Sequence, residues 1–419
     1  MRSLVKLLAL SSASLLSACG GDTGLQTVGS VAPPSGGGGG TPSASPTPTS
    51  THSFVAPTEV KSYEAIGGVQ HFEYATRSDG VGQGGQLYAG DANTVRDSGI
   101  TVAYNPRDAI FEVTINRPLG NVTTNVMRFQ DPAHRTDFGG AIEPQASVPD
   151  LPASRNIQYL ESGTSSGATT NPGDPYYSAG LGAGNSDYAV GAKGFTYSHQ
   201  TFFYQKPGTT TSYVTYAGFV RNSVTTTETQ DNATSPLYLK QSYSFDRGAF
   251  VFGERTANSA VPKTGTGSYS GEMIATMVFN PMLDTDPTYP TFFQWIQGTH
   301  TTSVNFASLA VTSNFTGTVL APARDAYTSG AYYLPAGTVF TATAGANIDL
   351  VNKGGFTGQF SAASFRLPNT TTFTVNIAGS SIDGAFFGPN GEEIGGGFRI
   401  VGGTPNERID ILGAFTGKK

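Results

Sequence analysis

Short runs in which apolar and polar residues alternate, separated by turn-forming residues, recur along the chain from Phe54 onward. Alternation with a period of two places the apolar residues of a run on one face, as in a β-strand. Among the 419 residues, 54 Gly and 25 Pro interrupt any long regular element. This combination excludes a coiled coil and a bundle of membrane-spanning helices, both of which need long apolar repeats. The 26 Phe and 19 Tyr provide bulk for a core and so exclude wholesale disorder.

Strand patterns in the first half of the chain are separated by long irregular stretches. The segment 105–108 has the composition of a turn between two alternating runs, which indicates a hairpin. From about 116 to 200 the sequence is rich in Gly, Pro and Ser and has no periodicity, which predicts long loops. We therefore expect a β-rich, loop-rich handle domain over residues 54–264. Its predicted strands are 101–104, 110–115, 213–219 and 245–252.

From residue 265 the strand pattern becomes denser. The predicted strands are 267–279, 304–306, 315–319, 339–343, 355–365, 373–377, 382–387, 395–400 and 409–415. About eight or nine strands in a stretch of this length are typical of a closed antiparallel barrel, and closure removes both exposed edges. The glycines within these runs are expected where a small barrel bends its strands. The sequence thus predicts an all-β chain with an eight-stranded antiparallel β-barrel over 265–419.

The first residues have the pattern of a secretory signal. Arg2 and Lys6 precede an apolar stretch over 7–16 that is too short to span a membrane. The sole cysteine follows in Leu16-Ser-Ala-Cys19, which resembles the bacterial lipobox. The resemblance implies cleavage after residue 18 and a covalent lipid on Cys19. An ordinary signal peptide followed by an incidental cysteine is the alternative, and no other cofactor is predicted.

The predicted lipid anchor is followed by a Gly/Pro/Ser-rich stretch, so that residues 19–53 comprise the lipidated cysteine and a flexible tether. Gly20 and Gly21, rather than Asp, follow the cysteine, which by resemblance to lipoprotein sorting rules favours the outer membrane. We therefore expect a chain anchored by lipid to the outer membrane and exposed at the cell surface.

The closing strands carry a resemblance to a known family. The segment 384–398 (Gly-Ala-Phe-Phe-Gly-Pro-Asn-Gly-Glu-Glu-Ile-Gly-Gly-Gly-Phe) and the segment 412–419 resemble the last barrel strands of transferrin-binding protein B and its lipoprotein relatives. The segments 248–253, 267–271 and 355–360 fit upstream parts of the same barrel. Full-length receptors of this family have two lobes, each with a handle domain and a barrel. Only one barrel motif occurs here, so the chain resembles a single-lobe member.

The resemblance implies a surface binding module rather than an enzyme. Its partner would be an extracellular protein or another iron or haem source, delivered to a TonB-dependent outer-membrane transporter. The alternative is a structural, adhesive or immune-evasion lipoprotein with no role in nutrient uptake. The formal net charge of −6 and the lack of a basic block argue against a nucleic-acid partner.

Aromatic residues between the first and second predicted barrel strands, and between later ones, are candidate ligand-binding residues. Exposed aromatic side chains on loops often contribute most of the binding energy of protein interfaces. The alternative is that Phe293 and Trp295 begin the next strand and pack inward. The candidates are Tyr289, Phe292, Phe293, Trp295, Tyr327, Tyr332 and Tyr333.

No catalytic or metal site is predicted from the remaining motifs. Glu392 and Glu393 are adjacent in a predicted strand, where neighbouring side chains point to opposite faces and do not converge on one bond. Ser165 lies in a Gly-x-Ser-x-Gly string that lacks the following helix of a nucleophile elbow. The five histidines are scattered, and none has the spacing of a metal motif.

Overall fold

Nearly all of the regular structure in the described part of the chain is β-strand. The computed structural model describes residues 59–77, 84–89, 98–116, 125–130, 148–166, 196–208, 210–280, 292–321, 334–352, 354–403 and 408–419. These residues form strands β1 to β19 and one 3₁₀ turn, η2 (Ala153–Arg155). The all-β prediction is confirmed. The strands form two open sheets, called sheet A and sheet B below, and one closed barrel.

Sheet A is a small antiparallel sheet with the strand order β1-β4-β5-β6. Its β4–β5 hairpin is the one predicted from sequence, and it closes at Asn105. The Asn105 side-chain oxygen accepts the backbone N–H of Arg107 at 3.0 Å, and its amide donates to Asp108 at 2.9 Å. The turn is therefore stabilised by its own side chains. The strands are β1 (Lys61–Glu64), β4 (Ile100–Asn105), β5 (Ile110–Ile115) and β6 (Asn125–Gln130).

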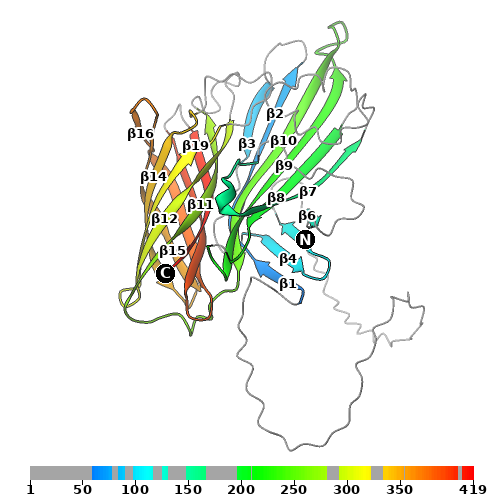
Figure 1. Ribbon diagram of the computed structural model, residues 1–419. Coiled ribbons are helices and arrows are strands. Elements are labelled where there is room, and N and C mark those ends of the chain that lie inside the picture. Colours follow the sequence, from blue (N-terminus) through cyan, green and yellow to red (C-terminus); the bar gives the residue numbers. More distant parts are fainter. Residues whose placement is uncertain are drawn as a thin grey trace, which may run out of the picture. The chain divides into compact units, whose positions relative to one another are not determined.

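Sheet B has the order β3-β2-β10-β9-β8-β7, with β9 and β10 as its longest strands. Figure 1 shows β9 and β10 side by side through the middle of this sheet. Every pairing in the sheet is antiparallel. The strands are β2 (Ile66–Arg77), β3 (Gly84–Ala89), β7 (Ile157–Ser166), β8 (Thr196–Gln205), β9 (Val214–Thr229) and β10 (Tyr238–Gly253).

Sheet B corrects one prediction. The stretch from about 116 to 200, expected to be long loops, contains β6, β7 and the start of β8. The described part of β7 lies at an edge of the sheet and pairs only with β8, and the second half of the strand is Glu-Ser-Gly-Thr-Ser-Ser. Only the first half of β7 carries apolar residues, of which Leu160 is fully buried, so the alternation is too short to mark the strand in the sequence.

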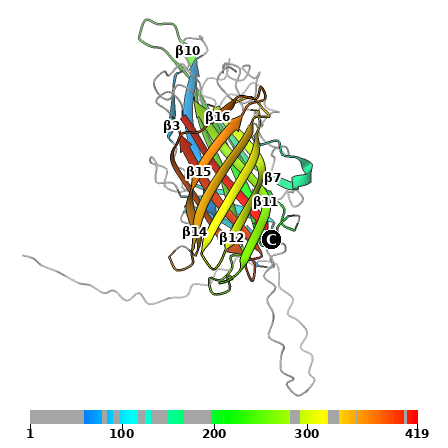
Figure 2. The same ribbon diagram turned by 90° about the vertical axis from the view of Figure 1, so that its left-hand side faces the viewer.

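The barrel is closed by eight strands in the order β14-β13-β12-β11-β19-β18-β17-β15, with β15 pairing back to β14. The short β16 (Thr372–Thr374) adds to the end of β15, where β17 no longer pairs with it. Figure 2 shows the barrel strands crossing the view at a tilt. The eight-stranded barrel predicted from sequence is confirmed. The strands are β11 (Thr266–Asn280), β12 (Phe292–Asn305), β13 (Ala310–Val319), β14 (Val339–Asp349), β15 (Gly355–Arg366), β17 (Ile377–Phe387), β18 (Glu393–Gly402) and β19 (Arg408–Lys418).

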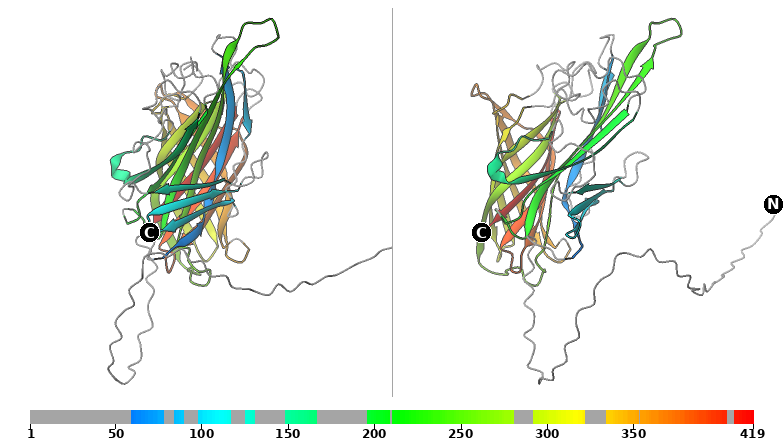
Figure 3. Two further views of the ribbon diagram at one scale, coloured as in Figure 1. Left: turned by 90° about the vertical axis from the view of Figure 1, so that its right-hand side faces the viewer. Right: turned by 45° about the vertical axis from the view of Figure 1, so that its right-hand side comes forward.

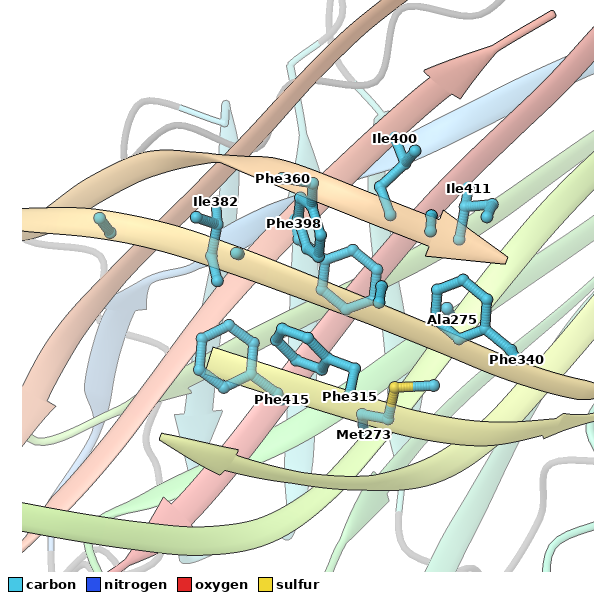
Figure 4. Close-up of a cluster of buried hydrophobic side chains, with 14 of the residues drawn as sticks. Met273, Ala275, Phe315, Phe340, Phe360, Ile382, Phe398, Ile400, Ile411 and Phe415 are labelled. Carbon is cyan, nitrogen blue, oxygen red and sulfur yellow. The ribbon is translucent and has the colours of Figure 1, made fainter. Parts of the chain in front are cut away.

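Apolar side chains fill the barrel interior. Phe315 lies among other rings, with centroids 5.1 Å from Phe398, 5.4 Å from Phe415 and 5.7 Å from Phe360. Figure 4 shows these rings with Met273 and several Ile side chains from other strands. A small barrel has an interior just wide enough for side chains. Here the described side chains occupy it, so the interior is a packed core.

Glycines in the barrel wall make room for these rings. Gly413 pairs directly with Phe398, and a Cβ on Gly413 would lie 2.1 Å from the tip of that ring. Gly384 stands in the same relation to Phe356. The strand glycines, expected only as bends, thus also provide the surface on which a cross-strand ring lies.

Sheet B is buried on both faces. Phe202 packs with the sheet A cluster, whereas its neighbour Phe203 packs with the outer wall of the barrel. The two sets follow the period-two alternation of the strands. At one point β2 and β18 approach so closely that a Cβ on Gly397 would lie 2.7 Å from the Cα of Gly67. Figure 3 shows sheet A against the face of sheet B that is turned away from the barrel.

Candidate functional site

His300 lies in a cluster of polar groups that is buried in the barrel interior. The ring of His300 lies with Nε2 3.1 Å from the carbonyl oxygen of Thr416 and Nδ1 3.1 Å from Oγ1 of Thr302, which is 2.8 Å from Oγ of Ser313. Because a carbonyl only accepts, the neutral ring donates from Nε2 and accepts from Thr302 at Nδ1. Burial lowers the pKa of His300 to about 4. The cluster is uncharged near neutral pH and is satisfied within the protein, so it presents nothing to a ligand.

The layer between sheet B and the barrel is more polar. The guanidinium of Arg155 donates to the carbonyl oxygens of Met273 at 3.1 Å and Gly298 at 2.8 Å, which are opposite each other on β11 and β12. Glu272 accepts from Gln205 Nε2 at 2.7 Å, and Arg155 Nε lies 3.9 Å from its other oxygen. These directional contacts fix η2 and sheet B against the barrel wall.

A second contact of this kind involves Glu393. Its carboxylate accepts the backbone N–H groups of Ser212, Tyr213 and Val214 at 2.6, 2.8 and 3.2 Å. Burial raises the pKa of this carboxyl, against the opposite effect of the three donors. Glu392 instead bonds to the backbone and side chain of Asn390. The two carboxylates therefore diverge, as predicted, and do not form an acid–base pair.

The sequence-predicted aromatic residues separate into two groups. Phe293 and Trp295 lie on β12 and are 6% and 5% exposed. Trp295 meets Phe203 of sheet B edge to face at 5.6 Å, and Phe293 lies against the guanidinium of Arg247. Both side chains point out of the barrel but are covered by sheet B, so the geometry does not support a role as exposed anchors. The backbone of Phe292 belongs to β12, but its side chain lies outside the described residues, as do Tyr289, Tyr327, Tyr332 and Tyr333.

The tip of the β9–β10 hairpin, residues 226–239, is the candidate binding surface. Among the described residues, the strands that pair with β9 and β10 in sheet B reach Thr225 on one side and Lys240 on the other, and the tip extends beyond those strands (Figure 3). Within it Leu237 is 60% exposed. Binding residues occur disproportionately on loops that a rigid scaffold positions, which makes this tip the candidate surface.

The hairpin tip is ordered by its own hydrogen bonds. Asn232 Oδ1 accepts from the backbone N–H of Thr234 at 3.0 Å and from its hydroxyl at 2.8 Å. The hydroxyl of Tyr238 donates to Asp231 at 3.1 Å. A preformed surface loses less conformational entropy on binding. Sequence analysis did not single out this tip, although the turn-forming run 230–236 between two polar strands indicates it.

The two ends of strand β10 face different surroundings. At one end is the hairpin tip. At the other, Glu254 directly follows the strand and forms an ion pair with Lys61, which lies close to residue 59, where the described chain begins. With about 3.3 Å per residue, the 16 residues of β10 separate the two ends by roughly 50 Å. The hairpin tip is therefore distal to residue 59, the first described residue.

The described residues were also compared with the patterns of metal sites and of membrane-spanning helices. In that part of the chain no group of three or more His, Cys, Asp or Glu side chains is arranged to hold a metal ion. None of the helical segments described has the length and apolar character to cross a membrane.

Comparison with known proteins gives one family match. Residues 261–419 match the family described as the C-lobe and N-lobe β-barrels of transferrin-binding protein B. No curated protein matches the chain.

Among solved structures, the chain is similar to a mutant of transferrin-binding protein B from Haemophilus parasuis Hp5, with 13% identity, 84% of this chain and 76% of that chain covered, and a TM-score of 0.27. It is also similar to HpuA from Kingella denitrificans in complex with human haemoglobin, with 12% identity, 74% and 83% covered, and a TM-score of 0.22. At these TM-scores the likeness supports no statement about the ligand of this chain.

Proposed function

We propose that the chain is a lipid-anchored binding protein of the outer-membrane surface, because residues 261–419 match the family of transferrin-binding protein B β-barrels. Its partner is an extracellular protein that carries iron or haem. The family is named for transferrin, and this chain takes a ligand of the same class. Delivery of the cargo to a TonB-dependent transporter is part of the proposal, as is the covalent lipid on Cys19.

The observation that carries the proposal is the filled interior of a barrel that matches the β-barrels of transferrin-binding protein B. The core cluster in the barrel includes Phe315, Phe340, Phe398 and Phe415, each at most 1% exposed. A ligand is therefore recognised on the outside of the molecule. The hairpin tip lies at the end of β10 opposite Glu254, and Leu237 within it is exposed.

Binding by cells that display the full-length chain tests this function. Labelled transferrin and haemoglobin are added, and the protein retained after washing is measured. In a variant, residues 230–237 are replaced by Asn-Gly, which closes a two-residue hairpin because Thr229 and Tyr238 are directly paired. Arg107→Ala, on the exposed turn of sheet A, is the control.

We expect one of the two carriers to be retained by the unmodified chain and by the Arg107→Ala control, and its retention to fall at least tenfold in the hairpin variant. Retention that persists in the hairpin variant contradicts recognition by the tip. Failure to retain either carrier contradicts iron or haem capture from these proteins and favours the structural or adhesive alternative.

A further inference from the structure

Three of the five large apolar side chains that are exposed among the described residues lie at the end of the fold opposite the hairpin tip. Among the described residues the exposed ones are Val60, Val126, Leu237, Leu309 and Val351. Leu237 belongs to the hairpin tip. Leu309 and Val351 occupy the turns β12–β13 and β14–β15, and Val60 directly precedes β1. We consider these three together because they lie at the end opposite the hairpin tip.

The two turns are neighbours in space. Their strands β13 and β14 are paired, and the backbone N–H of Ile348 donates to the carbonyl oxygen of Leu309 at 2.8 Å. In the second turn, Asp349 Oδ1 accepts the backbone N–H groups of Val351 at 3.1 Å and Asn352 at 2.9 Å. This cap holds the turn with Val351 92% exposed. The two apolar side chains are thus held on adjacent turns.

Leu309 occupies a position that other residues would fill more easily. Its φ of 60° lies in the left-handed region that favours Gly, Asn or Asp, and its side chain is 48% exposed. A leucine there adds backbone strain and leaves about half of an apolar side chain exposed. Strain of this kind points to a role outside the folding of the chain.

The same end of the barrel adjoins the start of the described chain. Asn258 Nδ2 donates to the carbonyl oxygen of Leu350 at 2.6 Å, and Glu254 forms an ion pair with Lys61. The four residues from 254 to 258 span at most about 14 Å. Val60 and the two turns therefore lie at the same end of the fold, where the described chain begins.

We propose that Val60, Leu309 and Val351 form a lipid-contact surface that rests on the membrane carrying the anchor. The inference depends on the proposed lipidation of Cys19. Three aliphatic side chains do not hold a protein on a bilayer by themselves, but a lipid anchor makes their contact intramolecular and raises the effective concentration of lipid. The contact orients the chain, with the hairpin tip directed away from the membrane.

Site-specific quenching tests this orientation. Full-length lipidated protein is bound to phosphatidylethanolamine/phosphatidylglycerol vesicles in which some acyl chains carry a nitroxide quencher. Because Cys19 is the only cysteine and is blocked by lipid, a Ser308→Cys substitution introduces a single reactive thiol beside Leu309 for a fluorophore. Thr234→Cys, in the hairpin tip, provides the matched distal probe.

We expect the nitroxide lipids to quench the probe at 308 at least twofold and to leave the probe at 234 unchanged. Leu309→Asp with Val351→Asp, in the Ser308→Cys chain, should abolish that quenching without detaching the protein from vesicles, since aspartate tolerates the backbone at 309. Equal quenching at both probes, or none at 308, in protein that sediments with vesicles overturns the inference and leaves the anchor intact. Failure to sediment overturns the anchor and the inference with it.

Discussion

The barrel interior and the layer between the barrel and sheet B differ in the polar groups that they bury. Rings and aliphatic side chains fill the interior, and the His300 cluster within it is uncharged. The outer layer also packs apolar side chains, such as Trp295 against Phe203, but in addition buries Glu393 and Arg155, whose partners are backbone groups of the facing element. Apolar packing is tolerant of direction, whereas charge-assisted hydrogen bonds are not. The interior therefore gives the barrel its stability, and the outer layer sets the alignment of sheet B on it.

Truncation of the central ring of the interior should have the largest effect. Phe315→Ala removes contacts with Phe360, Phe398 and Phe415 and leaves a cavity in a closed barrel that cannot collapse easily. We expect a loss of about 4 kcal/mol in the free energy of unfolding. Urea denaturation followed by circular dichroism measures it. Phe373→Ala, in the only partly buried β16, is the control and should cost less than half as much.

The polar cluster of the interior predicts a pH dependence. The pKa of His300 is lowered from 6.5 to about 4, so the folded state resists protonation that the unfolded chain accepts. The neutral His300 therefore contributes about 3 kcal/mol to the free energy of unfolding above pH 6.5. This contribution is lost as the pH falls from 6.5 to 4. The free energy of unfolding should therefore fall more steeply over this range in the native chain than in His300→Gln. Parallel pH profiles of the two proteins would contradict the assignment.

Filling the space beside a ring should be less harmful than removing the ring. In Gly413→Ala the added methyl group meets the tip of Phe398, which is fully buried and has little room to move. We expect a loss of about 2 kcal/mol. Gly345→Ala is the matched control, because no atom lies within 4 Å of a Cβ on that glycine of β14. A similar shift of the melting temperature in both variants would show that the ring does not occupy this space.

The outer layer should give a smaller effect. Arg155→Ala removes two hydrogen bonds to barrel carbonyls and leaves Glu272 without its nearby guanidinium, for a loss of about 1.5 kcal/mol. Arg107→Ala removes an exposed arginine that pairs only with Asp108 on the surface, and should change stability by less than about 0.5 kcal/mol. Differential scanning calorimetry of both variants checks the contrast. Equal melting temperatures would show that Arg155 does not help to hold sheet B against the barrel.

The barrel could be predicted closely because the local sequence of each strand and turn indicates its conformation. Alternation marks the strands, and the run Gly388-Pro-Asn-Gly391 marks a turn in which Gly388 and Gly391 have φ of 85° and 73°. Phe386, Ile394 and Phe398 pack inside, while Phe387 packs against sheet B, as a period of two requires.

The surroundings of the barrel could not be read in this way. Alternation shows that Phe293 and Trp295 share a face of β12, but nothing local indicates that Phe203, about 90 residues earlier, covers Trp295. Glu393 likewise bonds to backbone groups about 180 residues away, whose sequence carries no mark of the contact. The hairpin tip escaped prediction because its residues are polar turn formers, which occur on most surface loops.

The central claim is that an extracellular protein is recognised outside the barrel, at the distal hairpin tip. Hydrogen–deuterium exchange of the full-length chain, measured with and without the carrier protein that it retains, tests this claim most directly. The account predicts slower exchange of backbone amides over residues 226–239 and no change in the barrel strands that enclose Phe315. Protection confined to the barrel strands, or to the turns at 306–309 and 350–354, would contradict it.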